Sequence, residues 1–339
     1  MKKILLTLII IASILNANSQ TYAVSKKINV PGDGGWDYSA VDSENQKLFV
    51  SHGDVVNVID LKTDQTVAII PDTKGVHGIA IANDLNKAFI SNGKDNSITI
   101  IDLTTFAFIE KVAIQGIKPD AILYDKFSKK IFSFNAKTKD VTVLDAKTNK
   151  IVKTIPLEGK PEFSASNEKG LLYVNIEDKN EIKTIDTKKL EVVAKWSIAP
   201  GDEPTGLALD IKTNRLFAVC GNKLIVIVDA KSGKIMTTLP IGDGCDGVAF
   251  DAKKKLAFAS SGDGTITVIK EDKKDLFTVL ETIQTQKGAR TISINTTNGS
   301  LYLTTPEFGP KPEPTTENPK PRASIVPNSF KVLVVEATK

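Results

Sequence analysis

The residues of this chain that could do chemistry together are far apart in the sequence and recur at nearly regular intervals. Four carboxylates, one histidine, one arginine and one threonine each stand about 12 residues before an aromatic residue, in a pattern with a period of about 40 residues. They are Asp37, His77, Asp120, Glu162, Thr205, Asp246 and Arg290. Carboxylates bind cations and hydroxyl groups, and arginine pairs with anions. Such a set is typical of a ligand-binding site, provided that the fold brings it together.

The aromatic residues themselves mark the repeat that would do so. They open seven similar tetrapeptides, which begin at Phe49, Phe89, Phe132, Tyr173, Phe217, Phe258 and Tyr302. Within one repeat, such as residues 79–114, four short apolar segments alternate with turns rich in Asn, Asp and Gly. One such sheet cannot bury both faces alone, but sheets arranged radially can. The period therefore predicts an all-β fold, a seven-bladed β-propeller with four-stranded antiparallel blades.

The last repeat shows how the ring would close. It has only three strand-like segments, at 291–294, 301–304 and 332–335, whereas the segment 22–30 precedes the first repeat and resembles a fourth strand. We predict that this N-terminal strand completes the seventh blade and so removes two exposed sheet edges. In a propeller the innermost strands surround the central channel. The seven residues above, at the starts of these strands, are then predicted to meet at one central mouth.

Each position in this ring also has a simpler interpretation. Asp, Glu and Thr at the junction of a loop and a strand often cap turn amides. His77 and Arg290 do not fit that pattern, so we favour a ligand-binding ring. A second column of aspartates begins turns on the opposite face and is interpreted as structural: Asp102, Asp145, Asp186 and Asp229.

The tetrapeptides resemble the strand that defines the YVTN-repeat, or YncE-like, β-propellers, although no copy here is a perfect Tyr-Val-Thr-Asn. A second family-like pattern, an alternating apolar strand that ends in Asp before a Lys-Thr or Lys-Ser turn, recurs at 58–63, 143–148 and 227–232. The resemblance covers residues 22–339 and implies the propeller fold. It implies little about activity, because members are mostly of unknown function.

Some seven-bladed lactonases and lyases carry His, Glu and Arg near the channel, which suggests a catalytic alternative. Here His77 would be the base, Glu162 the acid and Arg290 the oxyanion clamp. No lactonase motif surrounds these residues, and His52 and His77 are the only histidines. We therefore expect ligand binding without intrinsic catalysis, metal or cofactor. A calcium ion held by the four mouth carboxylates is the remaining metal alternative.

Residues 1–19 have the form of a signal peptide. Lys2 and Lys3 precede an apolar run from 4 to 15, and Ala17-Asn18-Ser19 supplies small residues for cleavage before Gln20. The run is shorter than the ~20 residues that span a bilayer. We expect a secreted or periplasmic protein with no membrane span and with one domain over residues 20–339.

The expected export also bears on the two cysteines of the chain. Cys220 and Cys245 are the only cysteines and fall at the same face of neighbouring blades. An even number in an oxidising compartment predicts a disulfide bond between them.

The charges give little support to a nucleic-acid partner. Lys and Arg number 44 against 40 Asp and Glu, and the two signs are interleaved. Only three of the cations are arginines, and the chain has two tryptophans. Clustered Lys and Arg with stacking aromatic residues would be expected for phosphate recognition, although some relatives of this family are described as binding DNA. We expect a monomer whose partner is a small molecule or an envelope protein. A structural envelope scaffold and a nucleic-acid binder are further alternatives.

A proline-rich insertion is the second irregular feature. Residues 306–329 hold 7 of the 15 prolines and interrupt the seventh blade between its second and third strands. This composition favours extended polyproline geometry. The insertion lies on the same face as the mouth and is either a spacer loop or a lid or partner arm.

Overall fold

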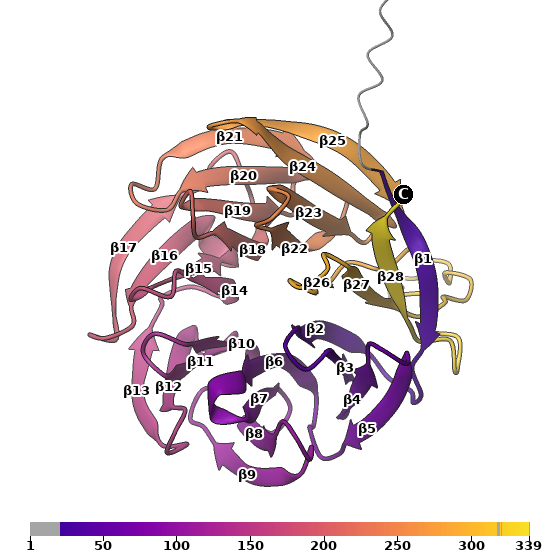
Figure 1. Cartoon of the computed structure of the whole chain (residues 1–339), viewed down its shortest axis with the longest axis horizontal. Coiled ribbons are helices and arrows are strands. Elements are labelled where there is room, and N and C mark those ends of the chain that lie inside the picture. Colours follow the sequence, from indigo (N-terminus) through magenta and orange to yellow (C-terminus); the bar gives the residue numbers. More distant parts are fainter. Residues whose placement is uncertain (1–20, 317–318, 320, 339) are drawn as a thin grey trace, which may run out of the picture.

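The computed structural model describes residues 21–316, 319 and 321–338 as a closed ring of seven four-stranded antiparallel sheets (Figure 1). In blades 1 to 6 the chain runs from the innermost strand to the outermost. The innermost strands are β2 (Trp36–Asp42), β6 (Val76–Ala82), β10 (Pro119–Asp125), β14 (Pro161–Ser166), β18 (Pro204–Asp210) and β22 (Cys245–Asp251). The second strands are β3 (Lys47–His52), β7 (Lys87–Asn92), β11 (Lys130–Asn135), β15 (Leu171–Ile176), β19 (Arg215–Cys220) and β23 (Leu256–Ser261).

The outer half of each blade is equally regular. The third strands are β4 (Val55–Asp60), β8 (Ser97–Asp102), β12 (Asp140–Asp145), β16 (Glu181–Asp186), β20 (Leu224–Asp229) and β24 (Thr265–Lys273). The outermost strands are β5 (Gln65–Ile70), β9 (Phe108–Ala113), β13 (Ile151–Pro156), β17 (Glu191–Ser197), β21 (Ile235–Pro240) and β25 (Leu276–Gln284). The helices among the described residues are two single 3₁₀ turns, η1 (Asn83–Leu85) and η2 (Glu177–Lys179).

The seventh blade confirms the predicted closure of the ring. It consists of β26 (Ile292–Ile294), β27 (Leu301–Thr305) and β28 (Lys331–Ala337), with β1 (Tyr22–Asn29) as its outermost strand. β1 pairs antiparallel with β28 from Tyr22 opposite Ala337 to Asn29 opposite Lys331. The Tyr22 ring also packs edge-on against Phe258 of blade 6, with ring centroids 5.0 Å apart. Both ends of the described chain are thereby held in one blade.

The core lies between neighbouring blades. All seven repeat aromatics are buried in the second strands, as the period predicts. Phe89 is representative: it is fully buried with Ile98 and Ile100 of its own blade, against Ile131 and Leu144 of blade 3. Each sheet face thus finds its apolar partner on the next blade.

The predicted disulfide bond is wrong. Cys220 and Cys245 are both buried free thiols. Cys220 belongs to the core between blades 4 and 5, together with Tyr173, whereas Cys245 packs with Val219 in the core between blades 5 and 6. The sheet of blade 5 therefore lies between the two sulfurs. Burial raises the pKa of the Cys220 thiol to about 12, so this thiol is also a weak nucleophile.

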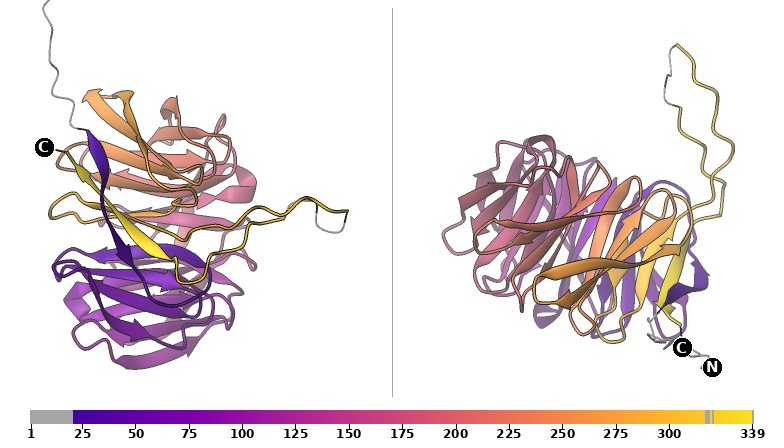
Figure 2. Two further views of the ribbon diagram at one scale, coloured as in Figure 1. Left: turned by 90° about the vertical axis from the view of Figure 1, so that its right-hand side faces the viewer. Right: turned by 90° about the horizontal axis from the view of Figure 1, so that it is seen from above.

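The proline-rich arm, residues 306–329, joins β27 to β28 as predicted. Figure 2 shows its described part projecting away from the ring. At its base, Phe308 forms a bridge with Ile325, and its ring lies 5.9 Å from the ring of Trp36. Trp36 directly precedes the ring residue Asp37, so the arm starts beside the mouth.

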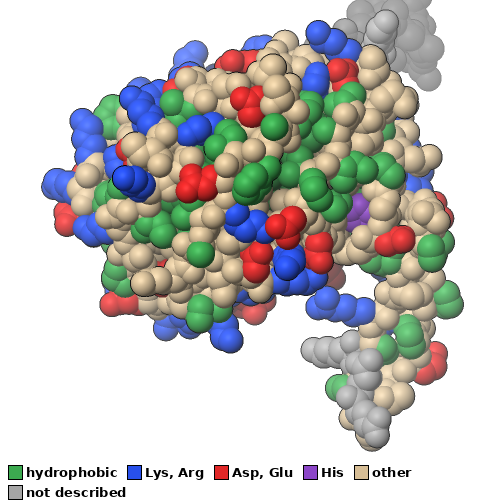
Figure 3. Space-filling view, turned by 90° about the horizontal axis from the view of Figure 1, so that it is seen from below, with side chains coloured by type: hydrophobic (Ala, Val, Ile, Leu, Met, Phe, Trp, Pro, Cys, Tyr) green, Lys and Arg blue, Asp and Glu red, His purple; other side chains and the backbone are tan. Residues whose placement is uncertain are grey.

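The surface agrees with a mixed-charge interpretation. Figure 3 shows acidic and basic side chains interspersed with apolar ones over the face in view. Among the residues that the structure describes, no helix is long and apolar enough to cross a membrane. The segment 1–19 lies outside the described residues, so the signal peptide stays a prediction.

Candidate ligand-binding site

The backbone places the predicted ring residues at one repeated irregularity. Six of them are the second residue of an innermost strand, and Arg290 lies two residues before β26. In blades 1 to 6 the pairing with the second strand slips at this point; in blade 1, Trp36 pairs with His52 but Ser39 pairs with Val50. A β-bulge of this kind re-aims side chains and is common beside functional sites. The innermost strands stand around the ring centre (Figure 1), so the seven positions form one rim, here called the central mouth.

Polar residues in the third position of the repeat tetrapeptides hold this rim. Ser91 accepts a hydrogen bond from the Gly78 amide at 2.8 Å and donates to the Asp120 carbonyl of the next blade at 2.5 Å. Asn175 donates in the same way to the Thr205 carbonyl at 2.9 Å. Ser260 makes an equivalent link to the Arg290 carbonyl, and Thr291, which directly follows Arg290, donates to the Asp37 carbonyl. These side chains therefore link the mouth backbone between blades 2 and 3, 4 and 5, 6 and 7, and 7 and 1.

Three ring residues from consecutive blades form one cluster. His77 Nδ1 lies 2.5 Å from Asp37 Oδ2 and 3.5 Å from Asp120 Oδ1. Burial opposes the charged form of His77, but the hydrogen bond with Asp37 and the charge of Asp120 outweigh it and raise the pKa of His77. Burial, with the charge of Asp37, raises the pKa of Asp120 to about 6, although His77 opposes that rise.

A second cluster forms around Lys160, which the sequence did not indicate as a site residue. Lys160 Nζ lies 2.7 Å from Glu162 Oε1 and also pairs with Glu177 at the start of η2. Burial and the nearby charge of Asp120 raise the pKa of Glu162 to about 8, even though Lys160 favours the ionised form. The Glu162 side chain is 11% exposed.

This pKa predicts a pH-dependent stability cost at Glu162. The ordinary pKa of a glutamate, 4.5, is lower than the folded-state value of about 8. Between these values the folded chain holds a proton that the unfolded chain has released, so stability falls as pH rises through that window. Glu162→Gln removes the charge. We expect the melting temperature of the variant, minus that of the parent, to be more positive at pH 9 than at pH 5.5 when both are measured in EDTA.

The matched control is Glu158→Gln, since the Glu158 side chain is 85% exposed. The melting temperature of this control, minus that of the parent, should stay nearly constant between pH 5.5 and pH 9. If the melting temperature of Glu162→Gln, minus that of the parent, is the same at both pH values or more negative at pH 9, Glu162 ionises in the folded chain without a cost in stability.

The third cluster pairs Asp246 with Arg290. Arg290 Nε donates to Asp246 Oδ2 at 2.6 Å, and its guanidinium carbon lies 5.4 Å from the centre of the Trp36 ring. Burial raises the pKa of Asp246, with Arg290 acting against that rise. The positive charge of Arg290 is therefore largely offset within the mouth.

Two aromatic residues form an apolar floor beneath the rim. Tyr38 and Phe163 follow Asp37 and Glu162 in the sequence, and their rings meet edge-on with centroids 4.6 Å apart, although they come from blades 1 and 4. A small cavity of about 120 Å³ lies beside them and is lined in part by Gly78. Burial, followed by the charges of the mouth carboxylates, raises the pKa of Tyr38 well above its ordinary value.

The structure thus distributes the seven predicted residues over three charged clusters and one cap. Thr205 is the cap, because its hydroxyl donates to the Cys245 carbonyl at 3.1 Å. The members of the catalytic alternative, His77, Glu162 and Arg290, each lie in a different cluster. Within the described chain, no hydrogen bond or ion pair joins any two of them. Lys160, Tyr38 and Phe163 were missed; the position of Lys160, two residues before Glu162, was the available signal.

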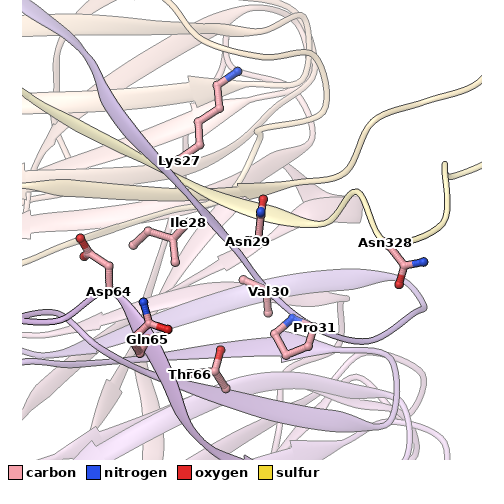
Figure 4. Close-up of a pocket in the computed structure, with 9 residues that line it drawn as sticks. All are labelled: Lys27, Ile28, Asn29, Val30, Pro31, Asp64, Gln65, Thr66 and Asn328. Atoms are coloured by element: carbon pink, nitrogen blue, oxygen red, sulfur yellow. The ribbon is translucent and has the colours of Figure 1, made fainter.

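A second hollow lies on the outer rim, where the ring closes. It has a volume of about 640 Å³ and runs between β1 and β5, lined by residues 27–31, 64–66 and Asn328 (Figure 4). An ion pair between Lys26 Nζ and Asp64, 2.6 Å long, joins the two strands. None of the seven ring residues lines this hollow, so it is a separate feature of the seam between blades 7 and 1.

The fold and the mouth define a seven-bladed β-propeller with a polar central rim, and comparison with known proteins finds YncE proteins among its homologues. Antigen Lp49 of Leptospira interrogans serogroup Icterohaemorrhagiae serovar copenhageni is 22% identical over 243 residues, which are 65% of this chain and 51% of that protein. The uncharacterized YncE proteins of Salmonella typhi and Salmonella typhimurium are 25% and 24% identical over 161 residues, 45% of each chain. These homologues confirm the resemblance to YncE-like propellers. The chain spans about half the length of the curated relatives it matches.

The other comparisons support the fold alone. No protein-family model matches the chain. A chain of Kuenenia stuttgartiensis hydrazine synthase superposes with a TM-score of 0.71 at 15% identity, covering 80% of this chain and 93% of that one. The RRP9 WD40 repeats superpose with a TM-score of 0.77 at 9% identity, covering 94% of this chain and 100% of theirs.

Proposed function

We propose that this chain is an exported binding protein of the cell envelope, which takes a small cationic or polyhydroxylated ligand at its central mouth without catalysis of its own. The observation that carries the proposal is the state of the mouth carboxylates. Asp120 and Glu162 stand on the rim of the mouth, and their side chains are only 9% and 11% exposed, so both carboxylates are largely removed from water. A cationic or hydroxyl-rich ligand supplies the partners that such groups lose on burial.

Two further features suit a binding site. The hydrogen bonds from blade to blade hold the rim in a preformed arrangement, which lowers the entropic cost of binding. The Tyr38–Phe163 floor gives the ligand an apolar surface below the charged rim. Because Asp246 already pairs with Arg290 and Glu162 with Lys160, the side of the mouth that carries Asp37 and Asp120 is the part most available to a ligand. Export rests on the form of residues 1–19.

The test is a thermal-shift screen with polyamines, amino sugars and neutral oligosaccharides, followed by single substitutions in the mouth. For a compound that raises the melting temperature of the parent, Asp120→Ala and Glu162→Ala are expected to weaken binding about 10- to 100-fold, the usual range for a lost hydrogen bond to a charged group. Arg290→Ala should weaken it as well if the compound spans the mouth. All variants should keep most of the parent's stability.

The control is Asp186→Ala. Asp186 caps the turn after β16 on the opposite face, where its carboxylate accepts from the amides of Lys188 and Lys189. This variant should bind as the parent does. If all three mouth variants also bind like the parent, the ligand lies elsewhere, and the proline-rich arm becomes the next region to test.

A further inference from the structure

We propose that Asp37, His77 and Asp120 form a binding site for a divalent transition-metal ion of the Zn²⁺ type. One ligand atom of each side chain, a histidine nitrogen or a carboxylate oxygen, lies within 4.8 Å of the other two. The three residues come from the innermost strands of three consecutive blades, β2, β6 and β10. This inference rests on the proposed function, because it names the ligand class that one side of the same mouth would take.

The spacing of the ligand atoms suits such an ion. Zinc bonds to histidine nitrogen and carboxylate oxygen are about 2.0–2.1 Å long, so tetrahedral ligand atoms lie about 3.3 Å apart. His77 Nδ1 is 2.5 Å from Asp37 and 3.5 Å from Asp120. All three ligand atoms lie within 4.8 Å of one another, so side-chain rotations, in which Asp37 moves away from the ring, would bring them to this spacing. His77 and Asp37 remain 24% and 19% exposed, which leaves the ion open to water or a small ligand from the mouth.

The surroundings of Asp120 give independent support for a cation-binding role. Its side chain is 9% exposed, and within the described chain no hydrogen bond to its carboxylate is found; His77 Nδ1, at 3.5 Å, is the nearest cationic partner. A buried carboxylate without hydrogen-bond donors costs free energy. The backbone of Asp120 is held in place, because its carbonyl accepts a hydrogen bond from Ser91, so the carboxylate cannot easily move out to water. A metal ion would bond directly to this carboxylate, which no cationic group of the described chain approaches more closely than 3.5 Å.

The histidine ring is held with the correct nitrogen toward the carboxylates. A Cβ atom added at Gly93 would lie 2.7 Å from both Nε2 and Cδ2 of His77, so the back of the ring fits against this glycine. Nε2 therefore keeps the proton when Nδ1 binds the ion. Gly93 acts as a positioning residue, because it sets the ring orientation without offering a ligand.

The ligand set selects among ions. One imidazole with two carboxylates suits zinc and its neighbours in the first transition row. Calcium prefers six to eight oxygen ligands. The other two mouth carboxylates, on Glu162 and Asp246, already pair with Lys160 and Arg290. The structure therefore favours a three-ligand zinc-type site over the four-carboxylate calcium site considered from the sequence.

The experiment is a titration of the EDTA-treated, full chain with ZnCl₂ in competition with a chromophoric chelator. We expect one Zn²⁺ per chain. Asp120→Asn and His77→Gln replace a carboxylate and an imidazole by a neutral amide, a weaker zinc ligand, and each should lose at least the 10- to 100-fold in affinity that is typical of residues which only orient a ligand. Asp186→Asn, a change of the same type on the opposite face of the ring, should bind Zn²⁺ as the parent does.

Gly93→Ala supplies a second, spectroscopic test. The added methyl group pushes the His77 ring away, so a chain loaded with Co²⁺ should lose the visible absorption of the parent's tetrahedral ion although all three ligands remain. Melting temperatures in EDTA identify any variant that fails to fold, and Asp120→Asn then carries the test in place of His77→Gln.

Three results would overturn the inference: no Zn²⁺ bound by the parent, unchanged affinity in Asp120→Asn and His77→Gln, or equal loss in Asp186→Asn. These failures are distinct from failure of the proposed function. If Zn²⁺ does not bind but a polyamine or sugar does, and Asp120→Ala weakens it, the metal inference is wrong and the mouth is still the binding site. If the substitutions change neither Zn²⁺ binding nor the binding of the polyamine or sugar, both the metal inference and the proposed function are wrong.

Discussion

Removal of residues 20–30 is expected to lower the melting temperature by about 10 °C or more, or to prevent folding, because it opens the ring. The cut deletes β1 and with it Tyr22, Ile28 and Val30, which are all at most 5% exposed. Burying one large apolar side chain contributes about 1.5–3 kcal/mol, so three of them are a large share of the ~5–15 kcal/mol that stabilises a typical protein. The loss also leaves the polar edge of β28 without a partner.

The control removes a similar number of residues from the arm. Deleting 311–321 shortens the projecting segment but spares β27, β28 and the contact between Phe308 and Trp36. This variant should melt within a few degrees of the parent, as thermal denaturation by circular dichroism would show. Equal melting of the β1 deletion and the parent would mean that the closing strand adds no stability.

Phe89→Ala is expected to destabilise the chain by about 3–5 kcal/mol, the usual cost of removing a buried aromatic ring. Phe89 is fully buried in the cluster between blades 2 and 3. Its loss would leave a cavity on a sheet face that has no water to fill it. Urea denaturation, with the slope compared between variants, measures the change in the free energy of unfolding.

Phe108→Ala in the same blade is the matched control. Phe108 lies in the outermost strand β9 and is 65% exposed. The same chemical change should here cost no more than about 0.5 kcal/mol, as is usual for exposed positions. Similar effects of the two substitutions would contradict the conclusion that the repeat aromatics build the core between blades.

The blade architecture was predictable because its determinants are local. Each blade is a meander of adjacent strands joined by short turns, so strand alternation, turn residues and the repeat aromatics such as Phe89 specify it within about 40 residues. The missing fourth strand of the last repeat then left the segment 22–30 as its only candidate, and β1 fills that place. The rim position of Asp37 and its equivalents followed from the same register.

The partners within the mouth were not predictable, because they depend on side-chain direction at the bulges. His77 meets both Asp37 and Asp120, but Glu162 turns to Lys160 and Arg290 to Asp246. No pattern within one repeat indicates which neighbour a rim side chain will reach. The Tyr38–Phe163 contact is harder still, since it crosses the ring between blades that are not adjacent.

The cysteines also show that the sequence did not reveal which side of a sheet a side chain faces. From the sequence alone, Cys220 and Cys245 fall at the same face of neighbouring blades, and that much is correct. Successive side chains of a strand point to opposite sides of the sheet, so a single residue decides which core a side chain enters. Cys220 enters the core on one side of blade 5 and Cys245 the core on the other. The sequence by itself determined the ring, its closure and the rim, because these follow from local periodicity; the tertiary structure alone decided which side chains face one another across blades, because that depends on packing.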